Sequence, residues 1–191
     1  MRRRGLLDGE RAPDGLTAPR VRRVRHSVIM ELVALPSPVL AALSRGDLAG
    51  AGELLGRALP GYFVDAELRH VWGLRLDQLT FDPASAGWGI HVAVTGDVAV
   101  GHGGFHGRPG SDGAVEIGYS VAPAHRRRGH GKAIVRELLR RAGAAPEVRT
   151  VRAVIDRDNA ASIATIGGLG FAGAGERGRD LVFEAPVGGG G

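Results

Sequence analysis

The chain has 191 residues, of which 43% are hydrophobic and 24% charged, proportions typical of one soluble globular domain. Its formal net charge is +5, but residues 1–27 hold eight arginines and three acidic residues, so residues 28–191 carry 17 basic and 17 acidic groups. The fold itself is therefore neutral and a nucleic-acid partner is not expected, while the absence of cysteine excludes disulfides, cysteine-ligated zinc and a cysteine nucleophile.

Both ends of the chain differ in composition from its middle. Residues 1–29 form a basic segment without periodicity and are predicted to be disordered, and the Gly-rich residues 185–191 likewise. The domain is predicted to span residues 30–184. No run of about 18 apolar residues is present, so no membrane partner is expected. The basic start lacks the apolar run of a signal peptide, which favours a cytoplasmic location.

The first half of the domain reads as one strand, two helices and three strands. Glu31–Leu35 predicts a strand, and apolar residues at helical spacing predict helices over 38–59 and 65–79. Three strands follow at 88–94, 98–105 and 115–121, the first two joined by a turn at Gly96-Asp97.

The second half alternates helices and strands. A helix is predicted over 130–143, a strand over 148–155, a helix over 159–169 that stops at Gly170, and a last strand over 181–184. This order predicts an α/β protein in which helices cover a mixed sheet.

A Gly-rich basic loop joins the strand at 115–121 to the helix at 130–143. It reads Val121-Ala-Pro-Ala-His-Arg-Arg-Arg-Gly-His-Gly-Lys132. Backbone N–H groups at a helix start converge on one point and favour an anion there, and glycines let a phosphate approach. Three arginines and Lys132 add positive charge. The loop therefore predicts a phosphorylated ligand.

Two common nucleotide motifs do not fit this loop. A Walker loop requires glycine at position 126, where Arg126 stands. A Rossmann fingerprint requires a third glycine at position 134, where Ile134 stands. The remaining structural alternative is an exposed arginine cluster that only flanks the start of a helix.

The pattern Val121-x-Pro123-x-x-Arg126-x-x-Gly129-x-Gly131 resembles the acetyl-coenzyme A loop of the GNAT N-acetyltransferases. The strand Glu116-Ile-Gly-Tyr119, the segment Asn159-Ala-Ala-Ser162-Ile163 and Leu169-Gly170-Phe171 also resemble that family, best its ribosomal-protein N-terminal acetyltransferase branch. The resemblance covers about residues 30–184. It implies a mixed, largely antiparallel central sheet flanked by helices, splayed between strands 115–121 and 148–155.

The resemblance also implies acetyl-coenzyme A as co-substrate and no metal. Ser120 and Val121 would offer backbone groups to the pantetheine arm, the loop would wrap the pyrophosphate, and Asn159 would contact the cofactor. Capping of the following helix is an equal alternative for Asn159. The implied cofactor-binding residues are Ser120, Val121, Arg126, Arg127, Arg128, Gly129, His130, Gly131, Lys132 and Asn159.

The catalytic groups are less defined. Many relatives place a tyrosine seven residues after the asparagine to protonate the leaving thiolate, and Ile166 stands there. Ser162 is the nearby hydroxyl, with a helix-surface or capping serine as the alternative. Glu116 is the candidate base or water-positioning group, because carboxylates are unusual in central strands. His102 and His106 are weaker candidates.

The implied activity is transfer of the acetyl group to a primary amine by direct attack in a ternary complex. The amine would belong to a small molecule or a protein N-terminus, and a homodimer is compatible with the resemblance. The alternative is an acyl-coenzyme A-binding module of the same fold that is regulatory or catalytically idle.

Overall fold

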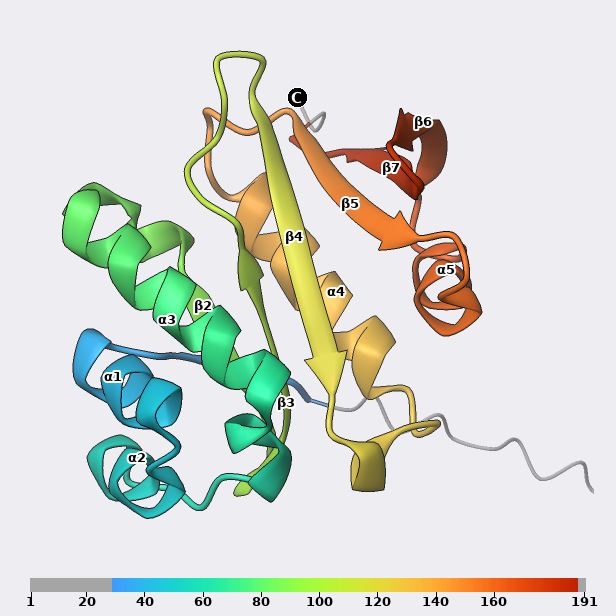
Figure 1. The fold of residues 1–191 in the computed structure, drawn as a ribbon. Coiled ribbons are helices and arrows are strands. Elements are labelled where there is room, and N and C mark those ends of the chain that lie inside the picture. Colours follow the sequence, from blue (N-terminus) through green and yellow to red (C-terminus); the bar gives the residue numbers. More distant parts are fainter. Residues whose placement is uncertain (1–28, 189–191) are drawn as a thin grey trace, which may run out of the picture.

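The structure is a computed structural model that describes residues 29–188, in which seven strands form one sheet in the order β1-β2-β3-β4-β5-β7-β6 (Figure 1). Neighbouring strands are antiparallel except β4 and β5, which are parallel. This confirms the predicted mixed, largely antiparallel sheet. The strands are β1 Glu31–Ala34, β2 Ile90–Thr95, β3 Val98–Phe105, β4 Ala114–Val121, β5 Thr150–Asp156, β6 Ala172–Arg177 and β7 Asp180–Pro186.

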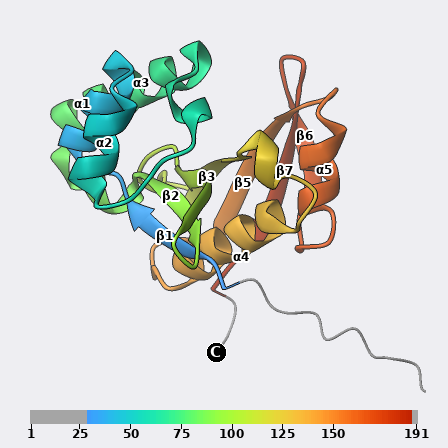
Figure 2. The same cartoon turned by 90° about the horizontal axis from the view of Figure 1, so that it is seen from below.

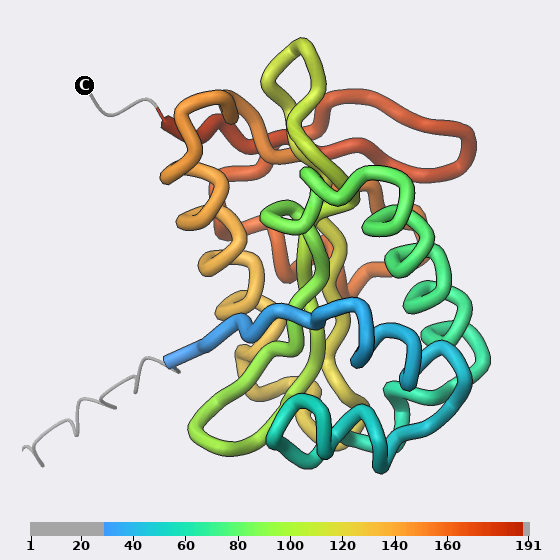
Figure 3. The backbone as a smooth tube through the Cα atoms, turned by 90° about the vertical axis from the view of Figure 1, so that its left-hand side faces the viewer, coloured from blue at the N-terminus to red at the C-terminus, as the bar shows by residue number. Residues whose placement is uncertain are grey.

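Helices cover both faces of the sheet. Three of them, α1 Ser37–Arg45, α2 Leu48–Leu55 and α3 Ala66–Phe81, lie on one face, and α4 His130–Gly143 lies on the other (Figures 2 and 3). The short helix α5 Ala160–Ile166 follows β5. Among residues 29–188, no helix has the length and apolar character that crossing a bilayer requires.

The two helical layers create two separate hydrophobic cores, because successive strand residues point to opposite faces. On β2, Ala93 packs into the core under α4, whereas Val92 and Val94 pack into the core under α1–α3. The second core is centred on the aromatic pair Phe63 and Trp72, which are fully buried and stacked 5.5 Å apart. The sheet therefore separates two hydrophobic cores that differ in the residues they contain.

The helix predicted over 38–59 is in fact two helices, and this part of the prediction is wrong. Gly46 adopts a left-handed conformation with φ 84° and ends α1 by donating its N–H to the carbonyls of Ala42 and Leu43. Asp47 then starts α2, because its carboxylate accepts a hydrogen bond from the Gly50 N–H at 2.8 Å. The apolar spacing continues across this break, and it hid the break from a periodicity argument.

The C-terminal part also differs from the prediction. The last helix ends at Ile166 and not at residue 169, and a strand that was not predicted, β6, follows it. All six residues of β6 are exposed and two are glycines, so it carries no apolar alternation; it exists because it pairs with β7 at the sheet edge. β7 extends to Pro186, beyond the predicted domain end at residue 184. The predicted tails otherwise lie outside the described residues.

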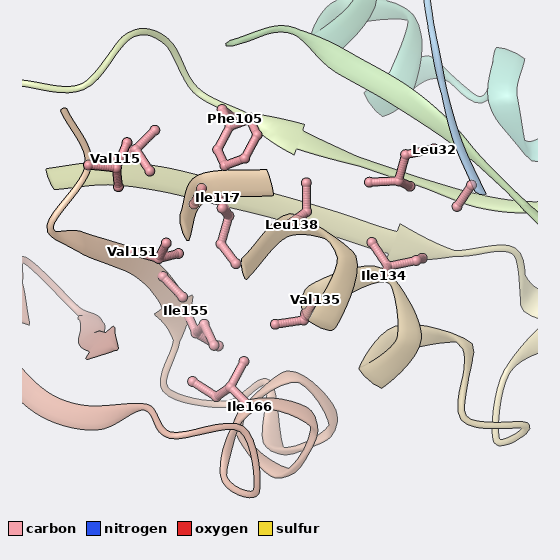
Figure 4. Close-up of a cluster of buried hydrophobic side chains, with 14 of the residues drawn as sticks. Leu32, Phe105, Val115, Ile117, Ile134, Val135, Leu138, Val151, Ile155 and Ile166 are labelled. Atoms are coloured by element: carbon pink, nitrogen blue, oxygen red, sulfur yellow. The ribbon is translucent and has the colours of Figure 1, made fainter. Parts of the chain in front are cut away.

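Helix α4 packs unusually close to the sheet at a glycine of β3. Ile134 and Leu138 of α4 point onto the strands, as the close-up of this core shows (Figure 4). A Cβ atom added at Gly103 would lie 2.5 Å from the Ile134 Cγ2 atom. The absence of a side chain at this position therefore sets how closely α4 approaches β3 and β4.

We expect Gly103→Ala to lower the free energy of unfolding by about 1–3 kcal/mol, because the added methyl group overpacks the interface with α4. Chemical denaturation measures this change. The matched control is Gly73→Ala inside α3, where a Cβ atom meets nothing within 4 Å. That control should be neutral or stabilising by about 0.5–1 kcal/mol. Equal effects of the two substitutions would contradict the close-packing argument.

Candidate functional site

The central parallel pair, β4 and β5, separates partway along its length. Residues 114–117 of β4 pair with residues 150–153 of β5, and the pairing ends at Ile117 and Ala153 (Figure 1). Residues 118–121 therefore have one edge that faces no strand, while their other edge still pairs with β3. Backbone groups on this free edge are available to a ligand. The predicted splay between strands 115–121 and 148–155 is thus confirmed.

A cavity of about 670 Å³ opens at this gap, within the size range of small-molecule sites. It lies between the end of β4, the basic loop and α5. Nine of the ten residues predicted to bind the cofactor line it: Ser120, Val121, Arg126, Arg127, Gly129, His130, Gly131, Lys132 and Asn159. The tenth, Arg128, is exposed and is not among the lining residues. The candidate acid Ser162 also lines this cavity, as do Tyr119, His125, Ala161 and Thr165, which were not among the predicted cofactor-binding residues.

The basic loop presents the start of α4 to this cavity. Pro123 begins a short 3-10 turn that ends β4, and the Arg126 Nε atom donates to the Val121 carbonyl at 3.1 Å. Gly129, in a left-handed conformation, precedes α4, and no side chain caps the first turn of this helix. The uncapped N–H groups and the helix dipole favour an anion at this point.

Arg127 carries backbone strain in the same loop. Its φ of 61° lies in the left-handed region, and it is the one non-glycine residue in residues 29–188 with a positive φ. Such conformations cost about 1–3 kcal/mol and persist where the surrounding structure enforces them. Arg127 lines the cavity, as does Lys132 on the first turn of α4.

The position of Asn159 is compatible with both roles that the sequence left open, which are capping of α5 and contact with the cofactor. Its Oδ1 atom accepts a hydrogen bond from the Ser162 N–H at 3.0 Å and caps α5. The same residue lines the cavity. Tyr119 was not singled out as a site residue, yet its hydroxyl donates to the Ser162 carbonyl at 3.3 Å and so bridges β4 and α5 across the gap.

A second cavity, of about 550 Å³, lies on the α3 side of β4. It is lined by α3, the 3-10 turn Gly61–Val64, β3 and the free part of β4. Tyr119, Ser120 and Arg126 line both cavities. The two cavities therefore meet at the splayed end of β4, with a different set of residues on either side.

A buried histidine and a partly buried tyrosine line the second cavity. The Tyr62 hydroxyl lies 3.2 Å from His102 Nδ1. Burial, with Arg75 nearby, lowers the pKa of His102 to about 4, and burial raises the pKa of Tyr62. At neutral pH the tyrosine is therefore the donor and the histidine a neutral acceptor. His102 is a weak base and serves better to orient Tyr62 than to remove a proton.

Glu116 is placed differently from its expected role. Its Oε1 atom accepts a hydrogen bond from His106 Nδ1 at 2.8 Å, and its Oε2 atom forms an ion pair with Arg177 Nη1 at 2.8 Å. Glu116 lines neither cavity, whereas His106 lines the second. A Cβ atom at Gly118 would lie 2.6 Å from His106 Nε2, so that nitrogen lies directly above the splay.

His106 has the properties of a neutral acceptor at this point. Burial and the neighbouring Arg75 lower its pKa, while Glu116 raises it. Because Nδ1–H donates to the carboxylate, the free lone pair is on Nε2. The sequence favoured the Glu116 carboxylate as the base. In the structure this carboxylate binds His106, and it is the histidine that lines the second cavity. Within residues 29–188, no cluster of three or more His, Asp or Glu side chains could hold a metal ion.

Comparisons with known proteins agree with this geometry. A family model described as an acetyltransferase (GNAT) domain matches residues 60–172. A Sinorhizobium meliloti phosphinothricin acetyltransferase with acetyl-coenzyme A bound is 23% identical, with a TM-score of 0.57 over 84% of this chain and 90% of that one. No curated protein sequence matches significantly.

Two further solved structures share the fold. Mycobacterium smegmatis RimJ, in complex with a coenzyme A disulfide, is 20% identical, with a TM-score of 0.59 over 82% of this chain and 81% of that one. A ribosomal-protein-alanine N-acetyltransferase from Brucella melitensis is 24% identical, with a TM-score of 0.53 over 83% and 99%. At these identities the structures establish a common fold.

Proposed function

The chain belongs to the GNAT acetyltransferase family, whose domain model spans more than half of its residues, and we propose that it transfers an acetyl group from acetyl-coenzyme A to a primary amine. One observation carries the proposal: two cavities meet at the free edge of β4, and one of them is lined by the basic loop. A donor and an acceptor can thus reach the same strand edge from opposite sides.

We place acetyl-coenzyme A in the cavity between β4, the basic loop and α5. Arg127 and Lys132, with the uncapped start of α4, would bind the pyrophosphate. Val121 would offer its backbone groups on the free edge to the pantetheine arm, whereas Ser120 pairs with His102 and turns its backbone groups toward β3. The acetyl-coenzyme A and the coenzyme A disulfide bound in two of the similar structures support this choice of ligand.

The amine acceptor is assigned to the second cavity. Its nitrogen attacks the thioester carbonyl carbon, the new C–N bond forms and the C–S bond breaks. The amine loses one proton to a base and the coenzyme A thiolate gains one from an acid. A backbone N–H on the free edge of β4, such as that of Val121, would polarise the carbonyl oxygen. The acceptors named for similar enzymes range from phosphinothricin to ribosomal-protein alanine.

We assign proton removal to His106 Nε2, with Glu116 as the carboxylate that orients the ring and raises its basicity. This differs from direct action of Glu116, because both of its oxygens already bind His106 and Arg177. Ser162 remains the candidate donor to the thiolate, since it lines the donor cavity beside Tyr119. Direct attack requires no covalent enzyme intermediate.

The activity itself is tested with acetyl-coenzyme A and a panel of primary amines that includes peptides with free N-termini. We expect release of free coenzyme A thiol that depends on the amine, with one acetylated product per thiol by mass spectrometry. Tight binding of acetyl-coenzyme A with no thiol release from any amine would refute the enzyme assignment and support the catalytically idle alternative.

Arg127→Ala should weaken acetyl-coenzyme A binding about three- to tenfold, because one charge-assisted contact to phosphate is lost. The effect should shrink as salt concentration rises. Arg128→Ala is the matched control, since it removes the same side chain from the same loop but outside the cavity. Calorimetric titration of both variants measures the difference, and an equal loss in the two would argue against the placement of the pyrophosphate.

His106→Asn should lower kcat about 100-fold at pH 7 with no change in acetyl-coenzyme A affinity, because it removes the base but no contact with acetyl-coenzyme A.

Glu116→Gln removes a group that raises the pKa of His106. The acidic limb of the kcat/KM profile should therefore move to lower pH in this variant. His70→Asn, exposed on α3, is the control. An unmoved limb in Glu116→Gln would rule out the pairing as a catalytic device.

A further inference from the structure

The second cavity is lined by an arginine whose N–H donors are not all paired with acceptors. Arg75 of α3 lines this cavity and is half-buried. Its Nη1 atom donates to Gln78 Oε1 at 2.9 Å and to the His106 carbonyl at 3.3 Å. Its Nε atom is buried without a partner. Among residues 29–188, no carboxylate lies within 4.0 Å of the guanidinium, whereas several other arginines in this range form salt bridges within that distance.

An arrangement of this kind is costly unless something else compensates it. Removing a cation from water is unfavourable, and an unpartnered buried donor adds to that cost. Desolvation accordingly lowers the pKa of Arg75. The charge of Glu116 opposes this shift, but its carboxylate already binds His106 and Arg177. The planar guanidinium matches a carboxylate in shape and charge. Nη1 is already bonded and Nε is inaccessible, but Nη2 forms no hydrogen bond among residues 29–188 and is not among the buried atoms, so a ligand carboxylate can supply the compensating charge there.

Arg75 stands next to the reaction centre. It holds the carbonyl of His106, whose ring lies above Gly118 at the start of the splay. A ligand anion on Arg75 would thus lie in the same cavity as the amine that His106 is placed to deprotonate. Amino acids are the simplest class of molecule that carries both a primary amine and a carboxylate.

We propose that the amine acceptor is an amino acid, held through its carboxylate by Arg75 while its amino group faces His106 and the free edge of β4. This inference rests on the proposed acetyl transfer and adds the chemical class of the acceptor. It also gives Arg75 a role in binding that is separate from the chemistry at His106.

The other charged residues of the cavity fit this arrangement. Asp65 and Glu67 also line it, but they are exposed at the N-terminal end of α3. Glu67 precedes Arg75 by eight residues, which is about 12 Å along a helix. Solvent screens these carboxylates more than it screens the half-buried arginine. Arg126 is held at the shared end by the Val121 carbonyl. A polyamine, which would use the acidic end alone, is the competing class.

The test compares acceptors that differ only in the carboxylate. Free L-amino acids, the primary amide of each and spermidine are offered to the full-length enzyme with acetyl-coenzyme A. We expect kcat/KM for the preferred amino acid to exceed that for its amide about tenfold or more. Amino amides lose their ammonium proton more readily than amino acids, so intrinsic reactivity works against this result. Equal values for acid and amide, or a preference for spermidine, would overturn the proposal.

Variants locate the preference. Arg75→Gln should reduce the ratio of acid to amide kcat/KM to near one, chiefly through KM for the acid. Arg69→Gln is the matched control on the same helix, because Arg69 donates to the Ser44 carbonyl away from this cavity. It should keep the wild-type ratio. Should Arg75→Gln unfold, Arg75→Lys, which keeps the charge but loses the planar fork, should give an intermediate ratio.

The outcomes separate this inference from the proposed function. If wild-type enzyme releases thiol with amines but the ratio survives in Arg75→Gln or Arg75→Lys, the amino-acid assignment fails and acetyl transfer stands. If no amine causes thiol release, acetyl transfer itself fails.

Discussion

The divergence of β4 from β5 is the constraint on which the rest of the site depends. Parallel pairing holds the two strands together over four residue pairs and then stops at Ile117 and Ala153. Past that point the β3 edge of β4 remains paired, so the strand stays rigid while its other edge becomes free. Tyr119 spans the gap and α5 begins just beyond β5. A ligand can therefore reach backbone groups that a closed sheet would occupy.

The sheet separates two sides that meet different needs. The side under α4 is packed around aliphatic residues, and the close approach at Gly103 fixes where the uncapped start of α4 lies. The side under α1–α3 contains the aromatic group around Trp72 and the buried His102. A phosphorylated donor suits the first side, where backbone N–H groups and cations converge. A smaller polar acceptor suits the second, where histidines and Arg75 line the cavity.

Hydrogen bonds and an ion pair link the charged side chains near the point where β4 and β5 separate. Glu116 lies between His106 and Arg177, and Arg75 holds the backbone of His106. The carboxylate therefore has its charge balanced inside the protein, whereas the Arg75 guanidinium has no carboxylate within ion-pair distance among the described residues. We propose that this asymmetry gives the two charged groups different functions: Glu116 orients the His106 ring, and Arg75 binds the carboxylate of a ligand.

The parts of the fold that local chemistry controls were predictable from the sequence. Periodicity and turn residues predicted β3, α3, α4 and the hairpin at Gly96, and the glycines and arginines of one loop predicted residues that line the first cavity.

Other features depend on contacts between distant segments, which local patterns do not encode. The break at Gly46 was masked by continuous apolar spacing, and β6 exists only through pairing with β7. Glu116 was visible as an odd carboxylate, but its partners His106 and Arg177 come from 10 and 61 residues away. Arg75 reaches His106 from another helix, 31 residues away. Side-chain chemistry at the acceptor end depends on which distant elements meet, because a free strand edge carries no sequence code for what packs against it.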